Sequence, residues 1–370
     1  MAEARISYAP TDELELIQST AAEFLADRFG TATVRELMMS DDGFDSAAWK
    51  EIVELGWTGL AIAEEHGGSG YGMIEMSALL EVMGRHVVPG PFFASAVLAT
   101  TAVQEAGTAE QQANLLPRLA SGEIGTLAVF ERARDWSLSK VETTATRDAE
   151  VWVLNGVKRY VLDGHLADLL VVAADQGLFV VESGADGVRI EQTPTLDATR
   201  RQATVSLEGV RVPSGSLLGD RGLDSLSRTL LLGTTALAAE QYGGITWCLD
   251  TSVEHAKTRH QFGRPIGSFQ AIKHRCAEML IKSEHSKSAA YHAARVTDDP
   301  DELAIAAPLA GSICSDGYVW AAGETIQILG GIGFTWEHDA HLYFKRAKAS
   351  SLLLGDPRHH RRLLGDAIGI

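Results

Sequence analysis

The sequence predicts an α+β protein in which a helical N-terminal region, a β-rich middle region and a helical C-terminal region follow one another. The spacing of apolar residues predicts this order, because it changes from three or four to two near residue 122 and returns after residue 223. The length agrees with it, since 370 residues are too many for one simple core. We therefore expect domains over residues 1–122, 123–224 and 225–370.

Helices joined by glycine and proline breaks are predicted for the N-terminal region. Apolar residues recur at helical spacing after Asp12 and after Thr20, and residues 45–56 combine an acidic N-cap with a glycine stop. Residues 58–72 look like a strand that enters a phosphate-binding loop, but their glycines follow GxGxG rather than GxGxxG and no βαβ unit surrounds them. We expect a plain loop there, and further helices over residues 74–85, 94–106 and 110–119.

Short alternating runs predict a compact antiparallel β-barrel or sandwich between residues 126 and 212. A hairpin is expected where residues 151–154 and 157–161 flank Asn155-Gly156, because this dipeptide readily adopts a type I′ turn. Further strands are expected over residues 169–173, 178–181 and 203–207. Beyond residue 223 the sequence predicts helices, over residues 225–257, 269–296, 301–329, 337–349 and 357–368.

Composition restricts the classes of partner. A net charge of −17 argues against a nucleic acid or an anionic membrane as the main partner. The three cysteines are too scattered for a disulfide framework or a zinc cluster. The longest apolar region, residues 230–239, is too short to span a bilayer, and the N-terminus lacks the apolar stretch of a signal peptide. We therefore expect a cytoplasmic protein.

Two segments at predicted helix ends contain residue types that suit a nucleotide cofactor. The first runs from Arg259 to Gln270 and includes Phe262, and an arginine, a glycine and a glutamine beside a helix N-terminus suit a diphosphate and a polar base. Taken alone, it could equally be an ordinary corner between two helices. The second starts at Gln327, and its glycines, which include Gly330 and Gly331, would let a ligand or another backbone approach closely.

Together, these segments resemble the acyl-CoA dehydrogenase family, whose signatures are R-x-x-F-G-x-x-I-x-x-F-Q and Q-x-x-G-G-x-G-[FY]. Residues 56–60, 65–68, 81–85 and 207–219 also resemble segments of that family, and the α–β–α order is the same. The resemblance implies flavin adenine dinucleotide (FAD) as cofactor and an acyl-CoA thioester as substrate. It implies α,β-desaturation, in which a carboxylate removes the α-proton while a hydride goes to the flavin.

The segments that cradle the flavin ring in this family depart from its pattern. A Thr-Glu-Pro segment and a small Gly-Ser-Asp turn are replaced by residues 129–135, which carry bulky charged side chains. A Trp-Ile-Thr or Trp-Ile-Ser segment is replaced by Tyr160-Val161-Leu162. Leu162 cannot donate a hydrogen bond to the ring. We expect that this chain does not hold an isoalloxazine ring by itself.

The catalytic base is missing at both positions that the resemblance implies. Gly233 and Leu354 stand there, and neither can accept a proton. Glu240 lies about two helical turns beyond Gly233 on a similar face and is a weak candidate for a displaced base. A structural role for this acid is the favoured alternative, so no catalytic residue is expected in this chain.

By the same resemblance, the residues that reach across a dimer interface to the AMP and pyrophosphate of FAD are kept. They are Arg259, Phe262, Gln270, Gln327, Gly330 and Gly331. A chain that keeps only this half implies a homologous partner subunit. The sequence resembles the smaller, base-lacking subunit of actinobacterial α2β2 acyl-CoA dehydrogenases that act on steroid acyl groups, for which an electron-transferring flavoprotein is the implied electron acceptor.

Two alternatives and two further clusters stay open. The chain could be an autonomous homotetrameric dehydrogenase with Glu240 as base, or a non-catalytic scaffold that does not contact FAD. Residues 337–341 contain two histidines and two acids, but the family's ordinary sequence here is similar, so we expect no metal site. Residues 359–362, His-His-Arg-Arg, could meet a CoA phosphate, although a solvated helix face is favoured.

Overall fold

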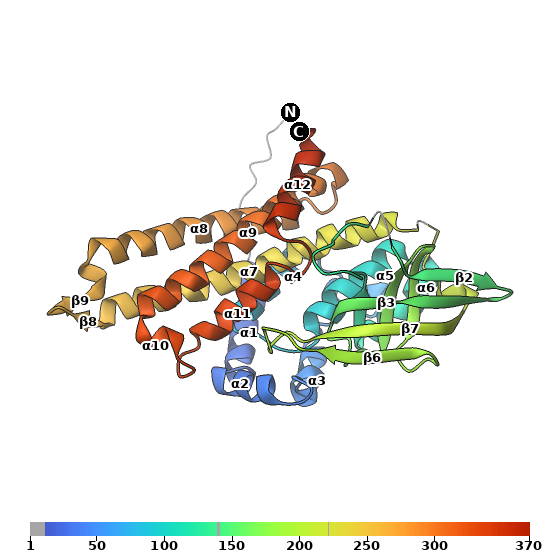
Figure 1. The fold of residues 1–370 in the computed structure, drawn as a ribbon, viewed down its shortest axis with the longest axis horizontal. Coiled ribbons are helices and arrows are strands. Elements are labelled where there is room, and N and C mark those ends of the chain that lie inside the picture. The colour runs from blue at the N-terminus through green and yellow to red at the C-terminus, as the bar shows by residue number, and fades with distance from the viewer. Residues whose placement is uncertain (1–11, 139–140, 221) are drawn as a thin grey trace.

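The computed structural model describes residues 12–138, 141–220 and 222–370, in the predicted order α, β, α (Figure 1). The long C-terminal helices run lengthwise beside one another. The strands lie toward one end of these helices, and the N-terminal helices pack against the side of the assembly (Figure 1). The division at residues 122 and 224 stays a prediction. No described helix is both long and apolar enough to cross a bilayer.

The N-terminal region is helical, as predicted. Asp45 caps α3 by accepting hydrogen bonds from the backbone nitrogens of Ala47 and Ala48. Between α3 and α4, the glycine-rich segment holds only a short 3₁₀ turn over Glu64–His66, so the prediction of a plain loop is confirmed. The bounds are α1 (Asp12–Arg28), α2 (Thr31–Met39), α3 (Ser46–Glu54), α4 (Met73–Arg85), a π-helical stretch (Phe93–Ala99) that continues as α5 (Thr100–Ala106), and α6 (Ala109–Ala120).

The middle region forms two open sheets rather than a closed barrel. One has the order β1-β4-β5 and the other β2-β3-β7-β6. The apolar side chains between them form one cluster, which fits the sandwich expectation. Pairing is antiparallel as predicted except between β1 and β4, which run parallel. The bounds are β1 (Gly125–Ala128), β2 (Thr144–Asp148), β3 (Val151–Leu162), β4 (Leu169–Ala174), β5 (Gly177–Glu182), β6 (Val188–Thr193) and β7 (Gln202–Pro213).

The predicted hairpin at Asn155-Gly156 is wrong, because this dipeptide lies inside the single strand β3. The pairing of β3 with β7 shifts register between Leu154 and Gly156, and the extra residue lies on β7, where Glu208 and Gly209 stand opposite Asn155. The Asn155 amide oxygen accepts a hydrogen bond from the Gly209 backbone nitrogen at 2.8 Å. A Cβ on Gly156 would lie 2.3 Å from the Thr143 hydroxyl oxygen. The glycine therefore permits close strand approach rather than a turn.

The C-terminal region contains the predicted long helices, with α7, α8 and α9 matching them within one or two residues. A short hairpin of β8 (His260–Gln261) and β9 (Arg264–Pro265) joins α7 to α8. The sequence did not predict the four-residue α10. The bounds are α7 (Asp224–Thr258), α8 (Gln270–Arg295), α9 (Pro300–Leu329), α10 (Gly331–Phe334), α11 (Ala340–Ser350) and α12 (Pro357–Ile368).

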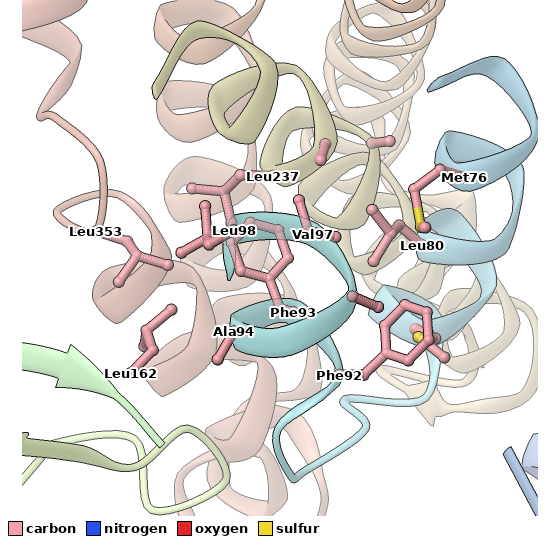
Figure 2. Packing of buried hydrophobic residues seen from close by; sticks show 14 of the residues in the cluster. Met76, Leu80, Phe92, Phe93, Ala94, Val97, Leu98, Leu162, Leu237 and Leu353 are labelled. Atoms are coloured by element: carbon pink, nitrogen blue, oxygen red, sulfur yellow. The ribbon is translucent and has the colours of Figure 1, made fainter. Parts of the chain in front are cut away.

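Close packing joins the three regions into one continuous core. Helices α4 and α7 cross where a Cβ on Gly84 would lie 1.9 Å from the Glu240 carbonyl oxygen, and a Cβ on Gly243 would lie 1.8 Å from that of Glu81. Figure 2 shows the apolar cluster beside this crossing. Side chains of the π-helical stretch meet Leu162 of the middle region and Leu237 and Leu353 of the C-terminal region. The interior is therefore shared by all three regions.

Candidate functional site

The residues predicted to bind a nucleotide lie toward one end of the C-terminal helices. Arg259 ends α7, Phe262 lies in the turn of the β8–β9 hairpin, and Gln270 begins α8. The other three stand where α9 meets α10, namely Gln327, Gly330 and Gly331. Both junctions lie toward the same end of the bundle (Figure 1). Along the described chain, no hydrogen bond joins one junction to the other.

All six of these residues are exposed. Exposure is unusual for a large apolar side chain such as that of Phe262. Phe262 is 90% exposed and Phe334 is 86% exposed. Phe262 has φ +54° and is followed by Gly263 at φ +79°, so a left-handed turn holds the ring outward. Nearby, the Lys345 ammonium lies 4.2 Å from the ring centroid of the exposed Trp336. This end of the molecule therefore presents aromatic rings and an arginine to something outside the chain.

The segment that replaces the flavin-ring cradle is hydrogen-bonded to neighbouring parts of the middle region. The Glu131 carboxylate accepts hydrogen bonds from the Lys158 ammonium at 2.6 Å and from the Thr143 hydroxyl at 2.7 Å. It also accepts from the backbone nitrogens of Glu142 and Thr143. Burial lowers the pKa of Lys158 to about 8, although the Glu131 carboxylate opposes this shift. The polar groups of this segment thus have partners within the chain.

The second cradle segment points its last residue into the core. Leu162 is 3% exposed and packs among apolar side chains that include Phe93 and Leu353 (Figure 2). A cavity of about 320 Å³, lined by Tyr160 of the same segment, lies between the β2-β3-β7-β6 sheet and α11. Its lining combines the rings of Phe130 and Tyr160 with cationic side chains. Neither Phe130 nor Leu162 carries a hydroxyl that could hold the edge of a flavin ring.

The two positions that resemblance marks for the base come together in space, and both are apolar. A Cβ on Gly233 would lie 3.1 Å from a methyl carbon of Leu354 and 2.7 Å from one of Leu98. Gly233 and Leu354 are buried. They are 121 residues apart in the sequence, so no local pattern could place them together. At this point of the core, none of these side chains can accept a proton.

Glu240, the weak candidate base, lies in a buried cluster of ion pairs. One of its carboxylate oxygens accepts a hydrogen bond from Arg200, and the other accepts one from Arg346 at 3.0 Å. Burial raises the pKa of Glu240, but the two guanidinium groups outweigh that effect and hold this pKa below its ordinary value. Both oxygens are engaged and the carboxylate is ionised, an arrangement typical of a structural acid.

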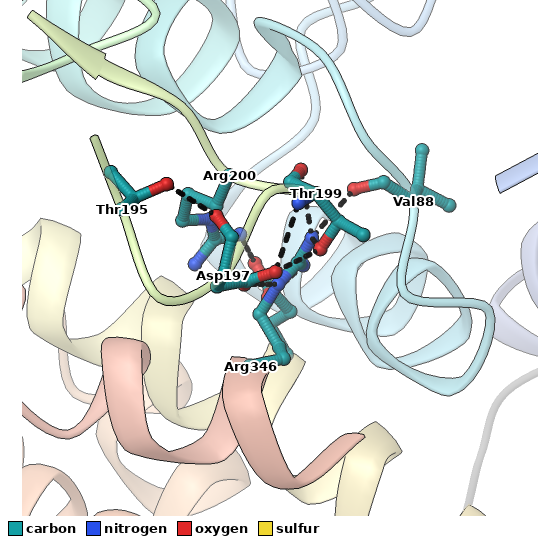
Figure 3. Close-up of polar contacts among 7 residues, drawn as sticks. Val88, Thr195, Asp197, Thr199, Arg200 and Arg346 are labelled. Carbon is teal, nitrogen blue, oxygen red and sulfur yellow. Dashed lines mark hydrogen bonds and ion pairs between the residues drawn. The ribbon is translucent and has the colours of Figure 1, made fainter. Parts of the chain in front are cut away.

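Arg346 is the centre of this cluster, and it contacts all three regions of the chain. Its guanidinium donates to the Asp197 carboxylate at 2.7 Å, to the Thr199 hydroxyl at 2.7 Å and to the Val88 carbonyl at 3.2 Å (Figure 3). Arg346 is only 1% exposed. Sequence reasoning missed this cluster, because no motif or periodicity marks an arginine that will be buried.

The histidine-containing segment 337–341 packs locally. The His338 Nδ1 atom accepts a hydrogen bond from the Ala340 backbone nitrogen at 3.1 Å. The His341 ring lies against Trp336, with 4.5 Å between the ring centroids. Burial, together with the nearby Lys345 and Arg35, lowers the pKa of His341 to about 4. Both rings therefore help to hold the exposed end of the helix bundle.

Comparison with protein families gives two matches. A family model described as "Acyl-CoA dehydrogenase, N-terminal domain" matches residues 11–123. A second, described as "Acyl-CoA dehydrogenase, C-terminal domain", matches residues 220–369. Together they cover well over half of the chain.

Individual proteins give the same match. The chain is 35% identical to acyl-CoA dehydrogenase FadE34 of Mycobacterium tuberculosis over 347 residues, which are 92% of this chain but only 45% of FadE34. It is 34% identical to acyl-CoA dehydrogenase IpdE2 of Mycolicibacterium smegmatis over 96% of this chain and 98% of IpdE2.

Solved structures agree over nearly the whole length. A chain of the ChsE4-ChsE5 complex from Mycobacterium tuberculosis superposes with a TM-score of 0.90 at 27% identity, over 98% of this chain and 99% of that one. A chain of the Tcur3481-Tcur3483 steroid ACAD superposes with a TM-score of 0.87 at 32% identity, over 97% of this chain and 98% of that one.

Proposed function

Because this chain belongs to the acyl-CoA dehydrogenase family, we propose that it is the flavin-sharing subunit of a heteromeric acyl-CoA dehydrogenase. In this proposal the chain supplies the AMP and pyrophosphate half of a shared FAD site. A larger homologous subunit supplies the ring cradle and the base, and the complex is an α2β2 tetramer. The contrast between an exposed, arginine-bearing bundle end and a buried, apolar Leu162 carries the proposal.

The side chains fit one half of FAD and not the other. At the bundle end, the guanidinium of Arg259 offers charge and paired donors for a diphosphate, and the amide of Gln270 offers a donor and an acceptor for a base. Gly330 and Gly331 leave room for a close approach, since no atom lies within 4 Å of where their Cβ would stand. In the interior, Leu162 and Phe130 offer no hydrogen bond to a ring.

The chemistry of the complex then divides between the two subunits. FAD, held on this side by residues such as Arg259 and Gln270, would supply the acceptor for the hydride that leaves the β-carbon of the acyl group. Residues of this chain bind and orient the nucleotide, while proton removal belongs to the partner because Gly233, Leu354 and the engaged Glu240 do not fit that role. A steroid-type acyl group is part of the proposal, as is an electron-transferring flavoprotein as acceptor. The likeness to a steroid ACAD supports the former.

Flavin content tests the proposal directly. The full chain is purified alone and after co-expression with the homologous larger subunit, and bound flavin is measured from its visible absorbance against subunit mass. A colourless lone chain and a complex with one flavin for every two subunits are the expected results. A lone chain that carries one flavin per subunit would overturn the proposal and make Glu240 the first base to examine.

A further inference from the structure

The cavity between the β2-β3-β7-β6 sheet and α11 has aromatic and leucine side chains in its wall. Three rings line it, those of Phe130, Trp136 and Tyr160, and Leu352 and Leu353 add further apolar surface. The Trp136 indole nitrogen donates a hydrogen bond to the Leu352 carbonyl at 3.2 Å, which ties the loop after β1 to the chain just beyond α11. Walls of this kind suit a ligand that contains a ring.

Two residues of this lining have a backbone conformation that is uncommon for residues with a side chain. Arg134 and Tyr160 each have φ +59°, in the left-handed region. Tyr160 lies where the pairing of β3 with β7 shifts register, between Lys158 and Val161. Such conformations persist where the surrounding structure fixes them, and they are frequent at binding sites. Both positions line the same cavity, which favours a binding role for it.

Cationic side chains form the polar part of the lining. They are Arg132, Arg134, Arg200 and Lys348, and the only acid beside them in the described lining is Asp135. Each of the three arginines has an ion-pair partner, but none of these carboxylates lines the cavity. Within the described chain, the Lys348 ammonium has no ion pair. The cavity therefore presents positive groups to its interior, while the balancing carboxylates lie outside its lining.

Arg200 is the buried member of this cationic set. Its side chain is 7% exposed, and its Nη2 atom donates a hydrogen bond to the Glu240 carboxylate. The guanidinium carbon also lies 5.2 Å from the ring centroid of Phe93. Its Nη1 atom has no hydrogen-bond partner among the described residues. Since buried polar atoms are normally hydrogen-bonded, a carboxylate at the base of the cavity would supply the missing partner.

We propose that this cavity binds a compact aromatic carboxylate. The ring of the ligand lies against Phe130 and Tyr160, its carboxylate accepts a hydrogen bond from Arg200, and the exposed cations at the mouth attract the anion. An oxidised flavin ring fits less well, because it is uncharged and its edge would find no hydroxyl on Phe130 or Leu162. The site is additional to the shared FAD site, and neither depends on the other.

A calorimetric titration tests the proposal with three probes, namely 2-naphthoate, its uncharged analogue 2-naphthamide, and inorganic sulfate. The full chain is used, or the complex where the chain folds only with its partner. One equivalent of 2-naphthoate per copy of this chain is expected, with the other two probes weaker by about tenfold or more. Absence of naphthoate binding overturns the proposal. Equal affinity for the amide or for sulfate also overturns it, because the cations or the ring walls would then have no role.

Riboflavin distinguishes this site from a site for the flavin ring. An excess of riboflavin should leave the affinity for 2-naphthoate unchanged. Competitive displacement of 2-naphthoate by riboflavin would overturn the proposal. The flavin content of the complex is read separately from visible absorbance, so the shared-FAD proposal can fail while this one holds.

Matched variants locate the binding. Lys348→Glu should weaken naphthoate binding by about tenfold, while Lys50→Glu makes the same change of net charge on exposed α3 and should have no effect. Ala349→Phe narrows the cavity and should weaken binding by a similar factor, with Ala47→Phe on α3 as its control. Equal affinities within either pair contradict the assignment to this cavity.

Arg200→Gln tests the proposed hydrogen bond itself. The variant should lose about a factor of ten in its preference for 2-naphthoate over 2-naphthamide, because the amide probe never had a charge to pair. Arg200 also pairs with Glu240, so circular dichroism checks that the variant is folded. Should it not fold, the variants at Lys348 and Ala349 decide. An unchanged preference in a folded variant would rule out Arg200 as the ligand's partner.

Discussion

The exposed bundle end and the buried junction of the three regions, which is the cluster around Arg346, both contain an arginine and large apolar side chains. These residues are exposed at the bundle end and buried at the junction. At the bundle end, Arg259 and Phe262 face outward. At the junction, Arg346 and Glu240 are buried and hydrogen-bonded to each other, and Leu162 lies in the core. The two arginines thus differ in what their guanidinium groups contact, since Arg346 is bonded within the chain and Arg259 is exposed.

The largest effect should come from removing the arginine of the junction. Arg346→Met leaves the buried Asp197 without its ion-pair partner and leaves Glu240 with Arg200 alone, and we expect the free energy of unfolding to fall by about 3–5 kcal/mol. Urea unfolding measures this change. Arg361→Met is the control, because its ion pair with Asp316 is exposed and should matter by less than about 1 kcal/mol. A similar loss of unfolding free energy in the two variants would contradict the difference between a buried and an exposed ion pair.

The stability of the folded chain should also fall in acid because of His360. Burial, followed by the nearby His359, lowers the pKa of His360 to about 4 from 6.5. The unfolded chain therefore takes up this proton first, and stability should fall between pH 6.5 and 4 by up to about 3 kcal/mol. His360→Phe should lose this part of the pH dependence in unfolding measured at pH 7 and pH 4.5. An unchanged pH dependence in the variant would contradict this assignment.

Replacing Glu240 separates structure from catalysis. Glu240→Gln should lower the free energy of unfolding by about 1–3 kcal/mol and leave turnover of the folded complex unchanged. The pKa of Glu240 is lower in the folded chain than its ordinary value. The ionised carboxylate therefore contributes to the free energy of unfolding at pH above the ordinary pKa, and this contribution is lost as pH falls through the folded pKa. The difference from wild type should therefore shrink in acid. A loss of turnover of about a hundredfold or more would identify Glu240 as a base.

At the bundle end, replacement should affect the cofactor and not the fold. Arg259→Gln should weaken FAD binding by the complex by about tenfold or more, because it removes charge-assisted hydrogen bonds to a phosphate. The unfolding energy should change by less than about 0.5 kcal/mol, since the side chain is exposed. Equilibrium dialysis of flavin measures the first and urea unfolding the second, with Arg361→Gln as control. Unchanged flavin affinity would favour a scaffold that does not contact FAD.

Long helices with a regular apolar spacing could be predicted from the sequence. A site at which strand pairing overrides a local turn preference could not. Apolar spacing predicted α7 and α9 almost to the residue, because each of these helices continues for eight or more turns. Asn155-Gly156 favours a turn locally, but pairing of β3 with β7 and contact with Thr143 override that preference. Short α2 and α10 bury too few residues to leave a clear period.

The candidate site was predictable only where its residues are close in the sequence. Arg259 and Gln270 share one helix junction, so their spacing could be read directly. The Arg346 cluster joins segments about 150 residues apart, which no local pattern reveals. The expectation of a solvated face at residues 359–362 is wrong for His360, because Gly311 of α9 leaves room for its ring to lie inside.

The glycine crossing of α4 and α7 acts as a fixed pivot for the whole of α7. Contact between the backbones at Gly84 and Gly243 sets the rotation of α7 about its own axis. Each residue of an α-helix advances about 100° and 1.5 Å, so deleting one residue between Gly243 and Arg259 would turn Arg259 by about 100° away from its present direction. The number of residues between Gly243 and Arg259 therefore determines the direction in which Arg259 points.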